Sequence, residues 1–174
     1  MNYSASLREL RYLVNTEKAE KLFLKHHRKW NKHISFFKAN WILEKTVAKI
    51  FSALNIKSKY LNAAIEKYQS RIDNGVLGTF ERTSEFGGDI TIYYRKNFTY
   101  ARFFAVLVHE CMHYYLCINH YDYSNEELTD LACYELGFDN IMTAGYASYS
   151  AKVSVYRHKL QVRPGYVHKD DPFS

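Results

Sequence analysis

The segment 99–118 constrains the fold of this chain more than any other. Apolar residues occupy every side of the helix that it predicts: Phe103, Phe104, Val106, Leu107 and Val108. A helix that is apolar all round is normally buried. The same segment contains His109, Glu110 and His113, whose polar side chains are costly to bury without partners. The sequence therefore predicts a central helix that must supply partners for these three side chains.

His109, Glu110 and His113 form an HExxH sequence, with the two histidines four residues apart. Residues at this spacing share one face of a helix, so both imidazoles can bind one zinc ion. Glu110 lies beside them, where it can act as general base toward a metal-activated water. Surface histidines on an amphipathic helix fit poorly, because the neighbouring residues leave little polar face. The motif predicts Zn²⁺ as cofactor, His109 and His113 as ligands, and Glu110 as the catalytic residue.

A second helix is predicted over residues 124–137. Ser124 and Glu127 have the spacing of a capping box, and Gly137 is a typical residue at a helix end. The loop 119–124, which joins this helix to the buried one, is short. We therefore expect the two helices to run antiparallel.

An antiparallel pair of this kind can supply a third metal ligand. Glu126 would then face His113 as a ligand. Asp130, one turn later, would face His109 and accept the proton of its second ring nitrogen. Asp130 and Glu127 are the alternative third ligands, since carboxylates in general can take this position. Glu127 is less suited, because as the capping-box residue it points about 100° away from Glu126.

The two motifs together resemble a known pattern. An HExxH helix followed by a helix that opens with NExxTD, here residues 125–130, resembles the gluzincin class of zinc metallopeptidases. The strand-like run 90–94 ahead of residues 102–110 is similar to the small bacterial ImmA/IrrE group of peptidases. The resemblance spans about residues 88–137. It implies a zincin-like α+β fold, a glutamate as third ligand and a later aspartate that orients a histidine.

The whole chain, residues 1–174, is expected to form a single α+β domain. Residues 1–75 are predicted to be a helical, basic half. Residues 76–137 are predicted to hold a small sheet and the two metal-bearing helices, and residues 138–174 to form an irregular tail. Several tail residues could stabilise a developing oxyanion, although the spacing selects none of them: Tyr146, Tyr156, His158, Tyr166 and His168.

Apolar periodicity gives finer expectations for the helical half. One helical stripe is predicted to be core, at steps of three and four: Phe23, His27, Trp30, Ile34, Phe37 and Trp41. A further helix is predicted from Ser58, its cap, to a stop at Asn74 and Gly75. It would carry Leu61, Ala64, Ile65 and Tyr68.

The period changes to that of a strand after Gly75. Residues 76–82 and 89–96 are predicted to form a hairpin around Gly87 and Gly88, with Ile90, Ile92 and Tyr94 on one face. We expect the strand at 89–95 to be an edge strand. A peptide substrate would lie along it by β-addition.

Charge and composition bear on partners and location. Residues 1–60 contain 13 Lys and Arg against 4 Asp and Glu, whereas residues 61–174 contain 11 against 14. Such a basic half could bind nucleic acid or another acidic partner, although a solvated helix face is the simpler interpretation. No apolar run approaches the roughly 18 residues of a membrane span. The three cysteines form no CxxC pair, so we expect a reducing, cytoplasmic location without a membrane partner.

These observations favour a zinc-dependent peptidase that acts on a peptide or protein. The alternative is a nucleic-acid- or protein-binding regulator whose zinc site is structural or vestigial. The two differ at the metal, because a catalytic site keeps an open position and a structural site is closed by a fourth protein ligand.

Overall fold

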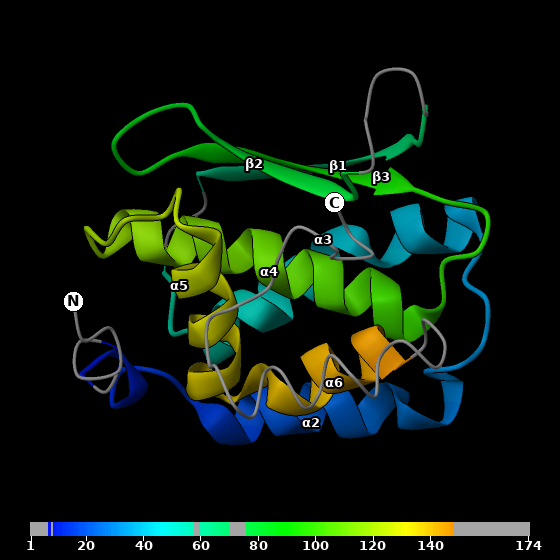
Figure 1. Cartoon of the computed structure of the whole chain (residues 1–174), viewed down its shortest axis with the longest axis horizontal. Coiled ribbons are helices and arrows are strands. Elements are labelled where there is room, and N and C mark those ends of the chain that lie inside the picture. Colours follow the sequence, from blue (N-terminus) through cyan, green and yellow to red (C-terminus); the bar gives the residue numbers. More distant parts are fainter. Residues whose placement is uncertain (1–6, 8, 58–59, 70–75, 148–174) are drawn as a thin grey trace.

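The computed structural model describes residues 7, 9–57, 60–69 and 76–147, with side chains to residue 145. It confirms a mixed α+β molecule (Figure 1). The elements, in chain order, are α2 (Thr16–His26), α3 (Phe36–Ala53), β1 (Leu61–Lys67), β2 (Gly78–Arg82), β3 (Gly88–Tyr94), α4 (Tyr100–Ile118), α5 (Glu126–Cys133) and α6 (Asp139–Ala147). Some predictions concern residues outside this description: the cap at Ser58, the stop at Asn74 and Gly75, and the tail from residue 148 to 174. The side chain of Tyr146 also lies outside it.

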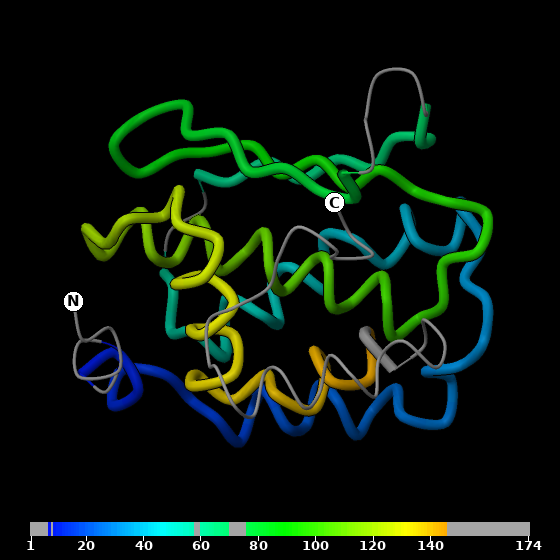
Figure 2. The backbone as a smooth tube through the Cα atoms, viewed as in Figure 1, coloured from blue at the N-terminus to red at the C-terminus, as the bar shows by residue number. Residues whose placement is uncertain are grey.

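The elements form three layers, which Figures 1 and 2 show edge on. The sheet is one layer, and α3 and α4 pack against it, α3 on β1 and α4 on β2 and β3. The third layer is made by α2 and α6, with α6 packed on both α4 and α2. Because α4 has elements on both sides, it is the central helix that its sequence predicts.

Burial of α4 is nearly complete. Every residue of this helix is buried except His109 and Ile118. Thr99 begins it, since the Thr99 side chain accepts a hydrogen bond from the Arg102 backbone N–H at 3.2 Å. A side chain at Gly145 of α6 would collide with the methyl group of Ala105, so α6 lies very close to α4. None of the described helices, α4 included, combines the length and apolar character needed to cross a bilayer.

The sheet has the strand order β1-β3-β2. β2 and β3 form the predicted antiparallel hairpin, and Ile90, Ile92 and Tyr94 are buried on one face as expected. The expectation that residues 89–95 form an edge strand is wrong, because β3 pairs with β1 on one side and β2 on the other. β2 and β1 are therefore the edges of this sheet.

Residues 61–67 form a strand, so the predicted helix there is wrong, as is a wholly helical half up to residue 75. Leu61 pairs with Gly88 and Lys67 with Tyr94, in parallel. The spacing of Leu61, Ala64 and Ile65 suits a helix, but Leu61, Ala63 and Ile65 also alternate as a strand requires. Pairing with β3 decides between these two patterns.

The single helical stripe predicted over residues 23–41 is also wrong in part. The chain leaves α2 at His26, passes through a short 3₁₀ turn and extended residues, and begins α3 at the Ser35 cap. This break changes the helical phase. Trp30 and Ile34 are buried as predicted. His27 is exposed, as are Phe37 (84%) and Trp41 (75%), against the prediction.

The helix after α4 begins and ends close to where it was predicted. Its cap is Asn125 rather than Ser124, and the Asn125 side chain accepts from the Leu128 backbone N–H at 3.0 Å. At the other end Gly137 has φ +95°, a left-handed conformation that interrupts the helix within a π-helical turn. Residues 139–147 then form α6, so this part of the tail is not irregular.

The expected antiparallel arrangement of α4 and α5 is not observed. α5 runs across the line of α4 instead of back along it (Figure 1). After the turn at Gly137, α6 packs alongside α4. Glu126, Asp130 and Cys133, which span the length of α5, nevertheless all interact with His109.

Replacing Gly137 by Ala should destabilise the protein. A Cβ atom there would sit at an unfavourable positive φ and 3.0 Å from Thr16 Cγ2. We expect a loss of about 1–3 kcal/mol in the free energy of unfolding, measured by urea titration. Gly137→Asn should lose less, because Asn adopts the left-handed conformation more readily. Equal stability of Gly137→Ala and wild type would show that the left-handed conformation at residue 137 does not require glycine.

Candidate metal centre

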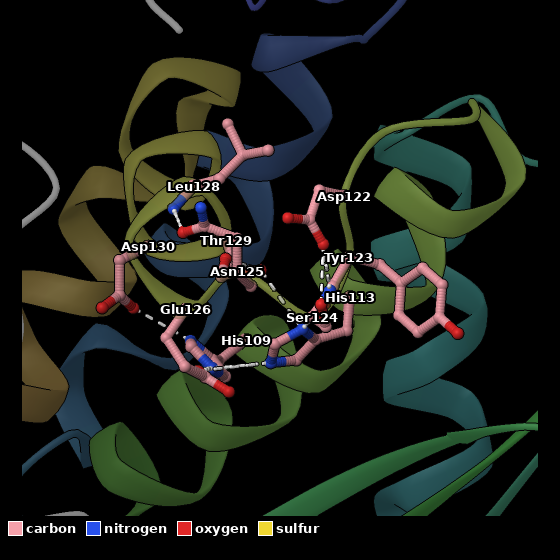
Figure 3. Close-up of polar contacts among 10 residues, drawn as sticks. All are labelled: His109, His113, Asp122, Tyr123, Ser124, Asn125, Glu126, Leu128, Thr129 and Asp130. Carbon is pink, nitrogen blue, oxygen red and sulfur yellow. Dashed lines mark hydrogen bonds and ion pairs between the residues drawn. The ribbon is translucent and has the colours of Figure 1, made fainter. Parts of the chain in front are cut away.

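Three side chains converge beside α5 (Figure 3). His109 Nε2 lies 2.9 Å from Glu126 Oε2 and 3.0 Å from His113 Nε2. His113 Nε2 lies 3.5 Å from the same Glu126 oxygen. The three residues could therefore hold a metal ion, each with one atom.

The spacing and the chemistry of these atoms fit zinc. Atoms bound tetrahedrally at zinc distances of about 2.0–2.2 Å are separated by about 3.3–3.6 Å. One separation in this group, 3.5 Å, lies in that range, and the other two, 2.9 Å and 3.0 Å, are slightly shorter. Two imidazole nitrogens and a carboxylate oxygen are also a donor set that zinc uses. The group needs only small adjustments to bind such an ion.

Hydrogen bonds at the rear of each ring fix which nitrogen faces the centre. His109 Nδ1 donates to Asp130 Oδ1 at 2.9 Å, and the Asp130 side chain is only 3% exposed. His113 Nδ1 donates to the backbone carbonyl of Tyr123 at 2.6 Å. Both rings therefore turn Nε2 toward Glu126, as metal-binding histidines do when their other nitrogen is held.

The electrostatics favour positive charge at the centre of the group. Burial by itself lowers the pKa of His109, but the Asp130 carboxylate, with smaller contributions from Cys133 and Glu126, raises it well above its usual value. Burial raises the pKa of Glu126, and its hydrogen bonds to the two histidines more than offset this and lower it. A cation at this point is stabilised, whether a proton or a metal ion supplies the charge.

The loop between α4 and α5 positions the Tyr123 carbonyl. The Asp122 carboxylate accepts from the Ser124 backbone N–H at 3.2 Å and from the Ser124 hydroxyl at 2.7 Å. Thr129 lies one turn into α5 and donates its hydroxyl to the Asn125 carbonyl at 3.0 Å. The turn and the helix start are therefore tied together next to His113.

Glu110 is buried beside the group, under strand β2. A Cβ atom on Gly78 of β2 would lie 2.6 Å from Glu110 Oε1, so the absence of a side chain there makes room for the carboxylate. Burial raises the pKa of Glu110, and the neighbouring charges of His109 and His113 oppose that shift. Phe80, also in β2, stacks on the His113 ring with their centroids 6.4 Å apart.

The structure brings together four of the residues singled out in the sequence and places Glu110 next to them. Glu126 reaches both histidines, and Asp130 contacts only the rear nitrogen of His109. Glu127 is exposed and is not in the group. The sequence reasoning missed Gly78, Phe80 and the Tyr123 carbonyl, of which only Gly78 has a sequence signal, as a glycine inside the predicted strand 76–82.

Comparisons with known proteins found no matching family model, no similar curated protein and no similar solved structure. The fold and the group of side chains define a small α+β protein with a candidate metal centre made by two histidines and a glutamate.

Metal affinity should distinguish the roles of the three candidate carboxylates. Glu126→Ala should abolish or severely weaken zinc binding, because two histidines alone hold the ion poorly. Asp130→Asn should keep zinc with an affinity about 10–100-fold lower, since it only orients His109. Glu127→Ala, the neighbouring matched change, should bind zinc like wild type. Titration against a chromogenic chelator measures all three, and a greater loss in Asp130→Asn than in Glu126→Ala would reverse the assignment.

Proposed function

We propose that this chain is a zinc-dependent peptidase of the gluzincin-like, zincin-fold type. The observation that carries the proposal is the convergence of His109 Nε2, His113 Nε2 and Glu126 Oε2, with the Glu110 carboxylate buried in the same turn of α4. Zinc held by these atoms acts as a Lewis acid that polarises a carbonyl and makes water more acidic.

The number of ligands supports a catalytic rather than a structural site. Structural zinc sites are usually closed by four protein ligands, whereas catalytic sites have three and leave one position open. In the part of the chain that the structure describes, no fourth His, Cys, Asp or Glu joins the group. Glu126 is also 64% exposed, so the group can be reached from solvent.

Glu110 supplies the proton transfer in this proposal. Its carboxylate oxygen accepts a proton from the water that attacks the scissile carbonyl, and later delivers that proton to the leaving amine nitrogen. Burial beneath Gly78 fixes the carboxylate on the histidine side of β2. A positioned carboxylate contributes more than a mobile one, because the reacting groups need no further ordering.

The exposed edge of β2 is the best candidate to hold the peptide. β2 pairs with β3 along one side only, and no described strand pairs with its other side. Gly78 contacts Glu110 and Phe80 stacks on His113, so this edge passes over the candidate site. A peptide added to β2 would present its backbone to Glu110. β2 thus takes the role first expected for residues 89–95.

Glu110→Gln tests the proposal directly. The change keeps the size of the side chain and removes its basicity, so zinc content and fold should be unchanged. Hydrolysis of a quenched fluorescent peptide library should fall by about 10²–10⁴-fold. Glu127→Gln is the matched control and should retain full activity. Zinc-loaded wild type that cleaves no peptide, or Glu110→Gln that cleaves as fast as wild type, would contradict the peptidase assignment and favour a structural site.

Gly78→Ala tests whether β2 positions Glu110. The added methyl group would overlap the Glu110 carboxylate, which has a flexible side chain and can move aside without unfolding the protein. We expect normal zinc binding and a fall in kcat of about 10–100-fold, because small misplacements of a reacting group are costly. Thr79→Ala, at the next position of β2, is the control. A normal kcat in Gly78→Ala would show that Glu110 acts independently of the strand.

A further inference from the structure

α3 carries a row of aromatic and basic residues that takes no part in the candidate metal centre. Phe37, Trp41, Lys45 and Lys49 recur every four residues, so each neighbours the next along the helix, and the row winds about 120° around it over about 18 Å. We call these four residues the α3 row. α3 contributes no side chain to the metal centre, which is formed by α4 and α5.

The aromatic end of the α3 row is exposed to solvent. Phe37 and Trp41 expose most of their surface, and the Lys38 ammonium lies over the Trp41 ring at 3.8 Å. Trp30 is different, because it is buried against Phe23 and Phe104. The core is therefore built without Trp41, and the exposed Trp41 ring is available to a ligand.

The basic end of the row belongs to a larger cluster of like charges. Partial burial lowers the pKa of Lys49, and its hydrogen bond with Lys25 and the charges of Lys25 and Lys45 lower it further. Burial lowers the pKa of His26 to about 4, with further contributions from Lys49, Lys25 and Lys29. Lysines from the end of α2 and the second half of α3 thus lie close enough to repel one another.

Few acidic groups offset this cluster. Residues 21–43 contain six Lys and Arg and no Asp or Glu, and Glu44 is the one acidic residue of α3. Within the described residues, no carboxylate forms an ion pair with Lys25, Lys29, Lys45 or Lys49. Crowded, uncompensated lysines beside a surface aromatic create a strong preference for a polyanion.

We propose that the α3 row, with Lys25, Lys29 and Lys38 beside it, binds single-stranded nucleic acid. Surfaces that bind single strands combine a basic track for the phosphates with exposed aromatic rings on which bases stack. Trp41 and Phe37 would stack bases, and the lysines would contact phosphates. A duplex suits the row less well, because its bases are already stacked on one another. The proposal does not depend on the metal centre.

The test is fluorescence anisotropy with labelled oligo(dT) and oligo(U) of roughly 20 nucleotides, longer than the usual site on one module. We expect wild type to bind at about 50 mM salt and to weaken steeply as salt rises. Trp41→Ala should weaken binding about 10-fold or more, by loss of stacking. Comparison of the affinities for oligo(dT) and oligo(U) shows whether the protein prefers single-stranded DNA or RNA.

Charge variants complete the experiment. Lys45→Glu should weaken binding and reduce its salt dependence. Lys21→Glu makes the same charge change on α2 at a lysine paired with Glu17, and should bind like wild type. Glu126→Ala, which removes a metal-centre residue, should also bind like wild type. Circular dichroism confirms that each variant is folded.

Four outcomes would overturn the proposal. The first two are no oligonucleotide binding by wild type at low salt, and equal oligonucleotide binding by Trp41→Ala and wild type. The third is an equal loss of affinity in Lys21→Glu and Lys45→Glu, and the fourth is tighter binding to vesicles of anionic phospholipid than to either oligonucleotide. The last result would assign the α3 row to a membrane surface instead.

Discussion

Two hydrogen bonds made at the rear of the histidine rings organise the centre of this molecule. Asp130 holds His109 and the Tyr123 carbonyl holds His113, so that a buried helix can carry two imidazoles whose Nε2 atoms meet Glu126. Without these partners the polar side chains of α4 would destabilise the core by several kcal/mol. The loop between α4 and α5, the start of α5 and the crossing of α5 over α4 all serve to place these two acceptors.

The parts of the fold that sequence could predict are those whose pattern allows one interpretation. α4 is apolar on every side, and the β2–β3 hairpin alternates clearly. β1 and the break after His26 escaped prediction because short apolar runs fit both helical and strand periods until a neighbouring strand or a cap selects one. The exposed Phe37 and Trp41 were assigned to the core for the same reason.

The candidate site also contains residues that the sequence could predict and contacts that it could not. The spacing within α4 and α5 singled out His109, His113, Glu126 and Asp130, with Glu127 as an alternative ligand, although the antiparallel packing assumed for the two helices is not observed. The histidines of α4 and the carboxylates of α5 still meet where the two helices cross. The two histidines are only one helical turn apart, as are the two carboxylates, so both pairs lie near the crossing point. Contributions from backbone, such as the Tyr123 carbonyl and the space at Gly78, depend on how loops and strands fold over α4 and leave little trace in residue identity.

The exposure of Glu126 has a kinetic consequence. His109 and His113 are held inside the fold, whereas Glu126 stands in the first turn of α5 with most of its side chain in water. An ion bound there could be exchanged by rotation of this one carboxylate, while the two imidazoles stay in place. Exchange would then occur on the timescale of side-chain motion and ligand release, without any unfolding of the core. Chelators would gain access to the ion while the protein remained native.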